Sequence, residues 1–151
     1  MKTARTLVGL AAASILFSTA AFAQAQQGSQ AKKGGKTAVR YASSDQLTYK
    51  ELAPKVSGAT VWGDPDKGAY SVFTKFAPGF DAGMHTHPND VSIVVLKGAY
   101  LYRDEAGEKR VGPGEFLRIP GGHKHWSGGD ANEGAQFYQH GTGKFDQKPA
   151  K

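Results

Sequence analysis

The chain has 151 residues, a length typical of one domain, which excludes a large multidomain assembly. Glycine supplies 20 residues, hydrophobic residues 39% and aromatic residues 11%, a profile typical of a turn-rich β domain with a packed core. Cysteine is absent, which excludes a disulfide framework, a thiolate metal site and a cysteine nucleophile.

The formal net charge of +6 at pH 7 is concentrated at the two ends of the chain. Residues 47–140 carry a net charge of −1 when their Lys and Arg residues are counted against Asp and Glu. A nucleic-acid-binding domain is expected to present a basic surface. The charge distribution therefore argues against a nucleic-acid partner.

Residues 1–23 have the organisation of a secretory signal peptide. Lys2 and Arg5 precede an apolar run over residues 7–22, and Ala21-Phe22-Ala23 ends in the small-x-small pattern of a signal-peptidase site. A transmembrane anchor is the alternative, but this run is rich in Ala, Ser and Gly and falls short of about 20 strongly apolar residues. We therefore predict export to the periplasm or the outside of the cell, with no stable membrane insertion.

The rest of the chain divides by composition. Residues 24–46 combine Gln, Ala, Lys, Gly and Ser with almost no large apolar side chain, which predicts a flexible leader. Residues 47–142 are predicted to form the folded domain, and residues 143–151 a C-terminal tail.

Short apolar segments alternate with turn signals throughout the predicted domain. The expected strands cover residues 59–62, 70–76, 91–96, 99–103, 116–119 and 136–140. Strands at this spacing, separated by turns rich in Gly, Pro and Asp, indicate an antiparallel sandwich or barrel. Only residues 46–52 are compatible with a helical turn, so we predict an all-β domain.

Four of the five histidines occur in two His-x-His pairs, His85/His87 and His123/His125. Residues i and i+2 of a strand point to the same face, so such a pair directs two imidazoles toward one point. Imidazole nitrogens bind Fe, Zn, Ni and Cu, and neutral ligands leave the ion its full charge for polarising a substrate. The pairs therefore predict a divalent-metal site, with a metal-free barrel that uses the imidazoles for hydrogen bonding as the alternative.

The histidines lie in two motifs that resemble those of the cupins. In the first, Gly79 is followed after five residues by His85-Thr86-His87, and the motif closes at Gly98. In the second, Gly114 is followed after five residues by Pro120-Gly121-Gly122, and after two more by His125. The resemblance implies a single antiparallel jelly-roll β-barrel. It also implies that His85, His87 and His125 are the ligands of a divalent metal such as Fe, Zn, Mn, Ni or Cu.

The motifs depart from the cupin pattern at two positions. Val91 stands where the family has a glutamate ligand, and Gly129 where it has an asparagine. Strand alternation from His87 predicts that Val91 points inward, which leaves three histidines around the metal. Asp90 or Ser92 would replace the glutamate only if the Pro88-Asn89 turn shifts the strand register by one residue.

Two further histidines have alternative interpretations. His123 either completes a four-histidine site or lies at the rim of the pocket, and we favour the rim. His140 ends the last expected strand, where we favour a structural role.

The resemblance also suggests a function. Three-histidine cupins include iron dioxygenases that cleave β-diketones or oxidise thiols, whereas those with the glutamate include quercetin dioxygenases and oxalate-metabolising enzymes. We therefore expect a dioxygenase-like metalloenzyme acting on a small organic molecule, although no catalytic nucleophile or general base is evident. The alternative is a protein that binds a metal or small ligand without turnover. Because exposed strand edges tend to pair, we also expect a homodimer.

Overall fold

The computed structural model describes residues 39–150. The expected signal peptide and most of the expected leader lie outside the described residues. All regular elements of the described part are strands, which confirms the prediction of an all-β domain. Nothing between residues 39 and 150 forms a helix of the length and apolar character that a membrane crossing needs.

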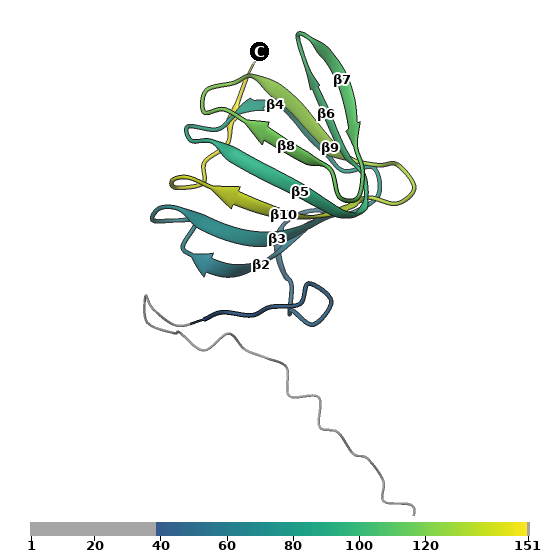
Figure 1. Cartoon of the computed structure of the whole chain (residues 1–151). Coiled ribbons are helices and arrows are strands. Elements are labelled where there is room, and N and C mark those ends of the chain that lie inside the picture. The colour runs from purple at the N-terminus through teal and green to yellow at the C-terminus, as the bar shows by residue number, and fades with distance from the viewer. Residues whose placement is uncertain (1–38, 151) are drawn as a thin grey trace, which may run out of the picture.

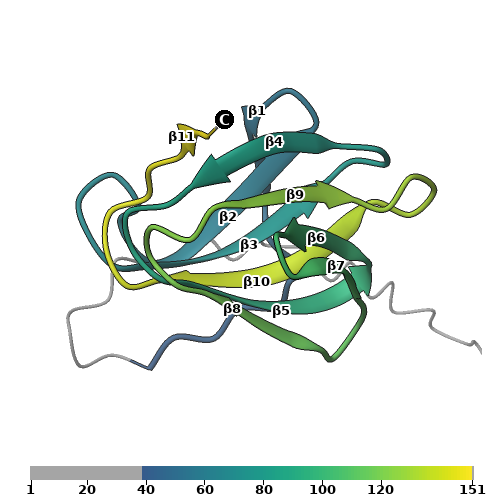
Figure 2. The same cartoon turned by 90° about the horizontal axis from the view of Figure 1, so that it is seen from above.

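The strands form two antiparallel sheets that face each other as two layers (Figures 1 and 2). The larger sheet has the order β1 (Lys50–Ala53), β2 (Val56–Gly63), β3 (Tyr70–Phe76), β10 (Ala135–Gly141), β5 (Val91–Gly98) and β8 (Phe116–Ile119). The smaller sheet has the order β11 (Lys148–Pro149), β4 (Asp81–Thr86), β9 (His125–Gly129), β6 (Tyr100–Asp104) and β7 (Gly107–Val111). Strands adjacent in space are often distant in sequence, as in a jelly roll.

The hydrophobic core lies between the two sheets. Along β5, Val91, Ile93 and Val95 are buried while the residues between them are partly exposed, the alternation expected of a strand with one covered face. Phe137 of β10 and Tyr100 of β6 pack against this row from both sheets. The inward faces of β5 and β10 thus form one wall of the interior in which the site lies.

Gly98, which closes the first motif, allows the chain to leave β5 in one sheet and enter β6 in the other. Its φ is +66°, a conformation that L side chains rarely adopt. A Cβ atom at this position would lie 2.4 Å from the carbonyl oxygen of Gly134. The motif glycine is therefore required by the turn and by the close approach of a second backbone segment.

The helical turn expected over residues 46–52 is wrong. Residues 44–46 form an isolated turn, with the Gln46 N–H donating to the Ser43 carbonyl at 3.0 Å, and the chain then enters β1 at Lys50. Pairing with β2 provides β1 with backbone partners that an isolated helical turn would lack.

The C-terminal segment, residues 144–150, lies along the barrel. Lys148 and Pro149 form β11, which pairs with the end of β4 at Thr86 and His85. The Phe145 N–H donates to the Pro65 carbonyl at 2.8 Å, which joins the segment to the β2–β3 connection. Residues expected from the sequence to form a tail thus run beside the first histidine motif.

Candidate metal centre

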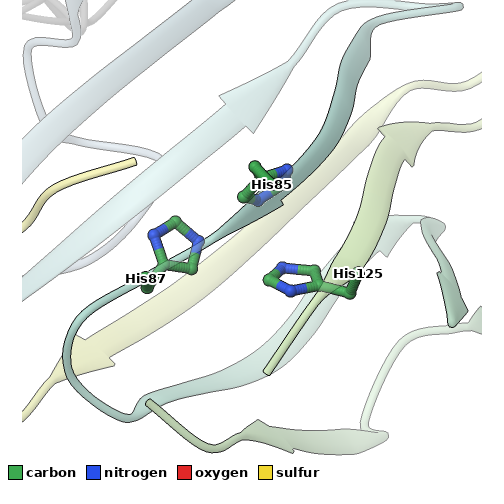
Figure 3. Close-up of side chains that lie close together, drawn as sticks. All are labelled: His85, His87 and His125. Atoms are coloured by element: carbon green, nitrogen blue, oxygen red, sulfur yellow. The ribbon is translucent and has the colours of Figure 1, made fainter. Parts of the chain in front are cut away.

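The two cupin-like motifs meet through the pairing of β4 with β9. His85 of β4 stands directly opposite His125 of β9 in the antiparallel register, and His87 follows immediately after the end of β4. The ring centroids lie 4.2 Å apart for His85–His125, 4.9 Å for His85–His87 and 5.4 Å for His87–His125. Figure 3 shows the three rings directed toward one another. One ring nitrogen of each residue lies within 4.8 Å of the other two, a separation that one metal ion can span.

Hydrogen bonds to backbone carbonyls fix the tautomer of each imidazole. Nδ1 of His85 lies 2.8 Å from the Gly83 carbonyl oxygen, Nδ1 of His87 lies 2.7 Å from that of Asp146, and Nδ1 of His125 lies 3.0 Å from that of His123. A carbonyl oxygen only accepts, so each Nδ1 must carry the proton and donate it. All three Nε2 atoms therefore retain a lone pair, which is the form that binds metals.

The Nε2 atom of His125 is buried and has no hydrogen-bond partner within residues 39–150. His125 is fully buried, and the ring of Tyr102 stacks on it at a centroid distance of 5.6 Å. A buried polar atom without a partner costs about 1 to 3 kcal/mol in desolvation. A cation shared with His85 and His87 would satisfy this atom.

Burial also keeps the three imidazoles uncharged. Desolvation lowers the pKa of His85 and of His87, and it lowers the pKa of His125 to about 4. At neutral pH the group therefore consists of three neutral imidazoles, whose Nε2 atoms carry no proton that a metal would have to displace.

These pKa shifts predict that acid destabilises the metal-free protein. The unfolded histidines take up protons near pH 6.5, whereas the folded ones do so only at lower pH, so the unfolded state binds more protons as the pH falls. We expect the free energy of unfolding to fall by about 1 to 3 kcal/mol between pH 6.5 and 5. Urea denaturation at fixed ionic strength measures this, and a flat profile would contradict buried neutral histidines. In His125→Gln the slope should be smaller.

Asp90, considered above as a possible fourth ligand, lies outside the histidine group and binds protein partners instead. Its carboxylate forms an ion pair with Arg118 and accepts a hydrogen bond from the Gly121 N–H at 2.8 Å. The neighbouring Gly122 N–H donates to the His87 carbonyl at 2.7 Å. Asp90 therefore helps to join the turn of the second motif to the first.

His123 and His140 also lie outside the group of three. Nε2 of His123 lies 2.9 Å from the Asp104 carboxylate, and more than a third of the His123 side chain remains exposed. Nδ1 of His140 lies 3.2 Å from the Ser71 hydroxyl, and the ring is beside Trp62 on the sheet face that points away from the core. Neither residue belongs to the group of three histidines whose ring nitrogens lie close together.

The two departures from the cupin pattern have distinct surroundings. Val91 is only 4% exposed and lines the same cavity as His85 and His87, so it points inward as strand alternation predicts. A Cβ at Gly129 would lie 3.0 Å from the Ala77 carbonyl oxygen. An asparagine at that position would therefore require the neighbouring backbone to move.

His85 and His87 line a cavity of about 650 Å³ between the sheets. This volume lies within the range of small-molecule sites. Its walls include the apolar side chains of Val72, Phe76, Phe80 and Ile93, together with the neutral polar side chains of Tyr70, Thr74, Gln139 and Gln147. The arrangement can hold a metal at one wall and a small organic molecule beside it.

Sequence reasoning missed the contribution of the C-terminal segment. The carbonyl that orients His87 belongs to Asp146, and the ring of Phe145 packs against His87 at a centroid distance of 5.3 Å. Phe145 and Gln147 also line the cavity. A backbone carbonyl carries no residue-type signal, so only the aromatic residue could have suggested a role for this segment.

Comparison with known protein families places the fold and the site in context. The family profile described as a domain of unknown function, DUF4437, matches residues 46–151, which cover the domain and all three clustered histidines. The chain belongs to the DUF4437 family. No curated protein matches this DUF4437 chain.

Solved structures similar to the DUF4437 chain share its fold. KdgF from Halomonas sp. is 21% identical with a TM-score of 0.55, over 66% of this chain and 91% of that one. The polyketide cyclase RemF from Streptomyces resistomycificus is 17% identical with a TM-score of 0.64, over 76% and 87%. An RmlC-like cupin from Shewanella frigidimarina is 12% identical with a TM-score of 0.56, over 70% and 92%. The DUF4437 domain therefore has the cupin jelly-roll fold, as the two motifs imply.

Proposed function

We propose that this DUF4437 protein is an exported metal-binding cupin, a small metalloenzyme with a three-histidine, dioxygenase-like centre that acts on a small organic substrate. The observation that carries the proposal is the buried Nε2 of His125, which has no protein partner and lies beside two imidazoles of the same tautomer. The signal-peptide pattern of residues 1–23 supports export.

The residues present fit a divalent metal. Three neutral nitrogen ligands are available, one each from His85, His87 and His125. Each ring donates its Nδ1 hydrogen to a backbone carbonyl, as metal-binding histidines commonly do. Three protein ligands leave coordination positions for substrate, as in catalytic rather than structural metal sites. When bound, the ion would supply Lewis-acid activation of a coordinated oxygen or sulfur, and a redox-active ion such as iron would add oxygen chemistry.

The cavity supports a small-molecule substrate. It holds about 650 Å³ beside His85 and His87, so a molecule bound there would lie next to the open side of the metal. Within the described residues, the Tyr70 hydroxyl and the Gln139 amide provide polar contacts in this wall. RemF, named as a polyketide cyclase, shows that the fold accommodates enzymes acting on organic molecules.

Metal analysis followed by oxygen uptake tests the proposal. The protein purified without its first 23 residues should contain close to one divalent ion per chain, measured by plasma mass spectrometry. After anaerobic loading with Fe²⁺, oxygen consumption is monitored with panels of β-diketones, thiols and flavonols, and the control is His125→Ala treated in the same way. Failure to retain any divalent metal would refute the proposal.

A binding protein without turnover is the second candidate. Among the described residues, the group of three histidines contains no carboxylate, and the acidic residues that line the cavity, Asp66 and Asp81, are exposed. Residues 39–150 thus offer no buried carboxylate as a general base at the centre. Stoichiometric metal without oxygen consumption on any of the three substrate panels would favour this candidate.

Val91→Glu provides a prediction for the position where cupins have a fourth ligand. Val91 faces the cavity, so the new carboxylate would add an anionic ligand, and we expect divalent metal to bind about tenfold tighter or more. The metal-free variant should be less stable than the wild type, because a buried carboxylate without a cation is costly. Calorimetric metal titration and thermal unfolding with and without metal measure both effects. Unchanged metal affinity would argue against the inward orientation of this position relative to the metal.

A further inference from the structure

We propose that the cavity binds an uncharged, mainly aromatic molecule, one polar end of which faces the three histidines, and that it rejects molecules whose body carries a carboxylate. This inference rests on the proposed function, because it places the ligand beside the metal. It specifies the class of substrate by charge and shape, which the fold alone does not determine.

Aromatic side chains from different elements form much of the inner wall. Phe76 packs against Phe80 at a centroid distance of 4.4 Å and stacks against Tyr100 at 5.7 Å, and all three rings line the cavity. On another side, Phe145 packs edge-on against Tyr70 at 6.1 Å, and both of these rings also line it. A planar apolar molecule can contact these rings in the offset or edge-to-face arrangements that aromatic groups prefer.

The charged groups around the cavity are unfavourable for an anionic ligand. None of the Lys and Arg side chains between residues 39 and 150 lines it, so a carboxylate bound inside would have no cationic partner other than the metal. Burying an unpaired carboxylate is strongly unfavourable. The acidic side chains among these residues that line the cavity are the exposed carboxylates of Asp66 and Asp81, whose charge repels an anion.

Asp81 is held in place by the protein. Its Oδ1 accepts hydrogen bonds from the Trp126 indole N–H at 2.6 Å and from the Gly83 N–H at 2.7 Å. Gly83 is also the residue whose carbonyl orients His85. Gly83 therefore fixes the Asp81 carboxylate through its N–H and orients His85 through its carbonyl.

Tyr70 provides a neutral hydrogen-bond donor in the wall. The residue is only 2% exposed, and its hydroxyl oxygen accepts a hydrogen bond from Gln139 Nε2 at 2.5 Å. Burial raises the pKa of the phenol to about 12, so it keeps its proton at neutral pH. With the oxygen occupied by Gln139, the phenolic proton remains for an acceptor in the cavity, such as a carbonyl, ether or hydroxyl oxygen.

Three hydroxamic acids that share the metal-binding group test the inference on Co²⁺-loaded protein. The hydroxamate group binds the metal in all three probes: benzohydroxamic acid, 4-carboxybenzohydroxamic acid and acetohydroxamic acid. Calorimetry and the visible absorption of Co²⁺ report binding without any turnover. We expect benzohydroxamic acid to bind at least about tenfold tighter than either of the others. Comparison with 4-carboxybenzohydroxamic acid measures the cost of the carboxylate. Comparison with acetohydroxamic acid measures the gain from the ring.

The results separate this inference from the proposed function. Failure of the protein to bind Co²⁺ would overturn both. Bound Co²⁺ with equal or tighter binding of the carboxylate probe would overturn the inference alone, as would equal binding of the acetyl and benzoyl probes.

A charge introduced into the wall gives a second comparison. Gln139→Lys places an ammonium group in the cavity and should bring the two aromatic probes to within about threefold of each other. Ser92→Lys is the matched control, because Ser92 lies between the inward-facing Val91 and Ile93 and thus points away from the cavity. That variant should retain the wild-type ratio. A similar change in the affinity ratio of the two aromatic probes in both variants would mean that the preference does not arise in the cavity. If Gln139→Lys does not fold, the ratio measured on the wild type decides the inference.

Discussion

His125→Ala is expected to weaken divalent-metal binding at least about 100-fold. The substitution removes the nitrogen that has no hydrogen-bond partner among the described residues, and it leaves two of the three clustered histidines. Loss of an outer partner of a metal ligand already costs about 10- to 100-fold in affinity, so loss of a ligand should cost no less. Metal content after dialysis, together with competition against a chromophoric chelator, measures the change. His85→Ala and His87→Ala should produce losses of the same order.

His123→Ala is the matched control for this prediction. It removes an imidazole from the same His-x-His pair, but one that binds the Asp104 carboxylate and lies outside the group of three histidines. We expect metal affinity within about twofold of the wild type, because the residue's backbone carbonyl, which orients His125, remains in place. An equal loss of metal in His123→Ala would show that the ligands are a different set of histidines.

A second consequence follows for the folded state without metal. Removal of the His125 imidazole also eliminates a buried polar atom that lacks a partner, so the metal-free His125→Ala protein loses packing against Tyr102 but gains relief from that desolvation cost. The rise in melting temperature that metal causes in the wild type should therefore disappear in the variant. The melting temperature of the metal-free protein should change less than that of the metal-loaded protein. A metal-dependent rise in melting temperature that survives in His125→Ala would contradict the site.

The strands that could be predicted are those with apolar alternation. The prediction for residues 70–76 agrees with β3, and the one for residues 116–119 agrees with β8. β7, with the sequence Gly-Glu-Lys-Arg-Val, escaped prediction because it is an exposed edge strand with one buried residue. β9 is absent from the expected strands because it ends in Gly128-Gly129, which does not look like a strand. Glycine is needed there because a side chain at Gly128 would collide with the Phe80 carbonyl. Tertiary pairing, rather than local preference, makes these segments strands.

The sequence indicates which three histidines the structure brings together, but it does not indicate their arrangement. The spacing of His85 and His87 predicts that both point to one side of a strand; in the structure both are buried, with His85 in β4 and His87 just after its end. The direct pairing of His85 with His125 depends on the register between β4 and β9, which are separated in sequence by four other strands. No local pattern specifies such a register. The same limit applies to Asp146, whose contribution is a carbonyl that any residue would provide.

Deletion of residues 144–151 is expected to weaken metal binding about 10- to 100-fold while the histidines themselves remain. The deletion removes the Asp146 carbonyl that accepts the proton of His87 Nδ1 and the Phe145 ring that packs on the same imidazole. His87 would then be free to rotate or to adopt the other tautomer, and loss of such an orienting partner has an effect of this size. Metal titration of the truncated chain measures the affinity, and circular dichroism verifies that the barrel is folded.

A chain that ends at Gln147 separates orientation of His87 from loss of β11. This shorter deletion removes Lys148 and Pro149, which pair with β4, but keeps the Asp146 peptide carbonyl and the Phe145 ring. Because the Phe145 N–H still donates to the Pro65 carbonyl and the Gln147 amide to the Ala82 carbonyl, the segment retains two attachments to the barrel. We expect metal affinity within about threefold of the full chain. Equal weakening of metal binding by both deletions would mean that the edge strand β11 holds the first motif in place and that the carbonyl of Asp146 does not act on its own. Unchanged metal binding in both would mean that the barrel alone positions His87.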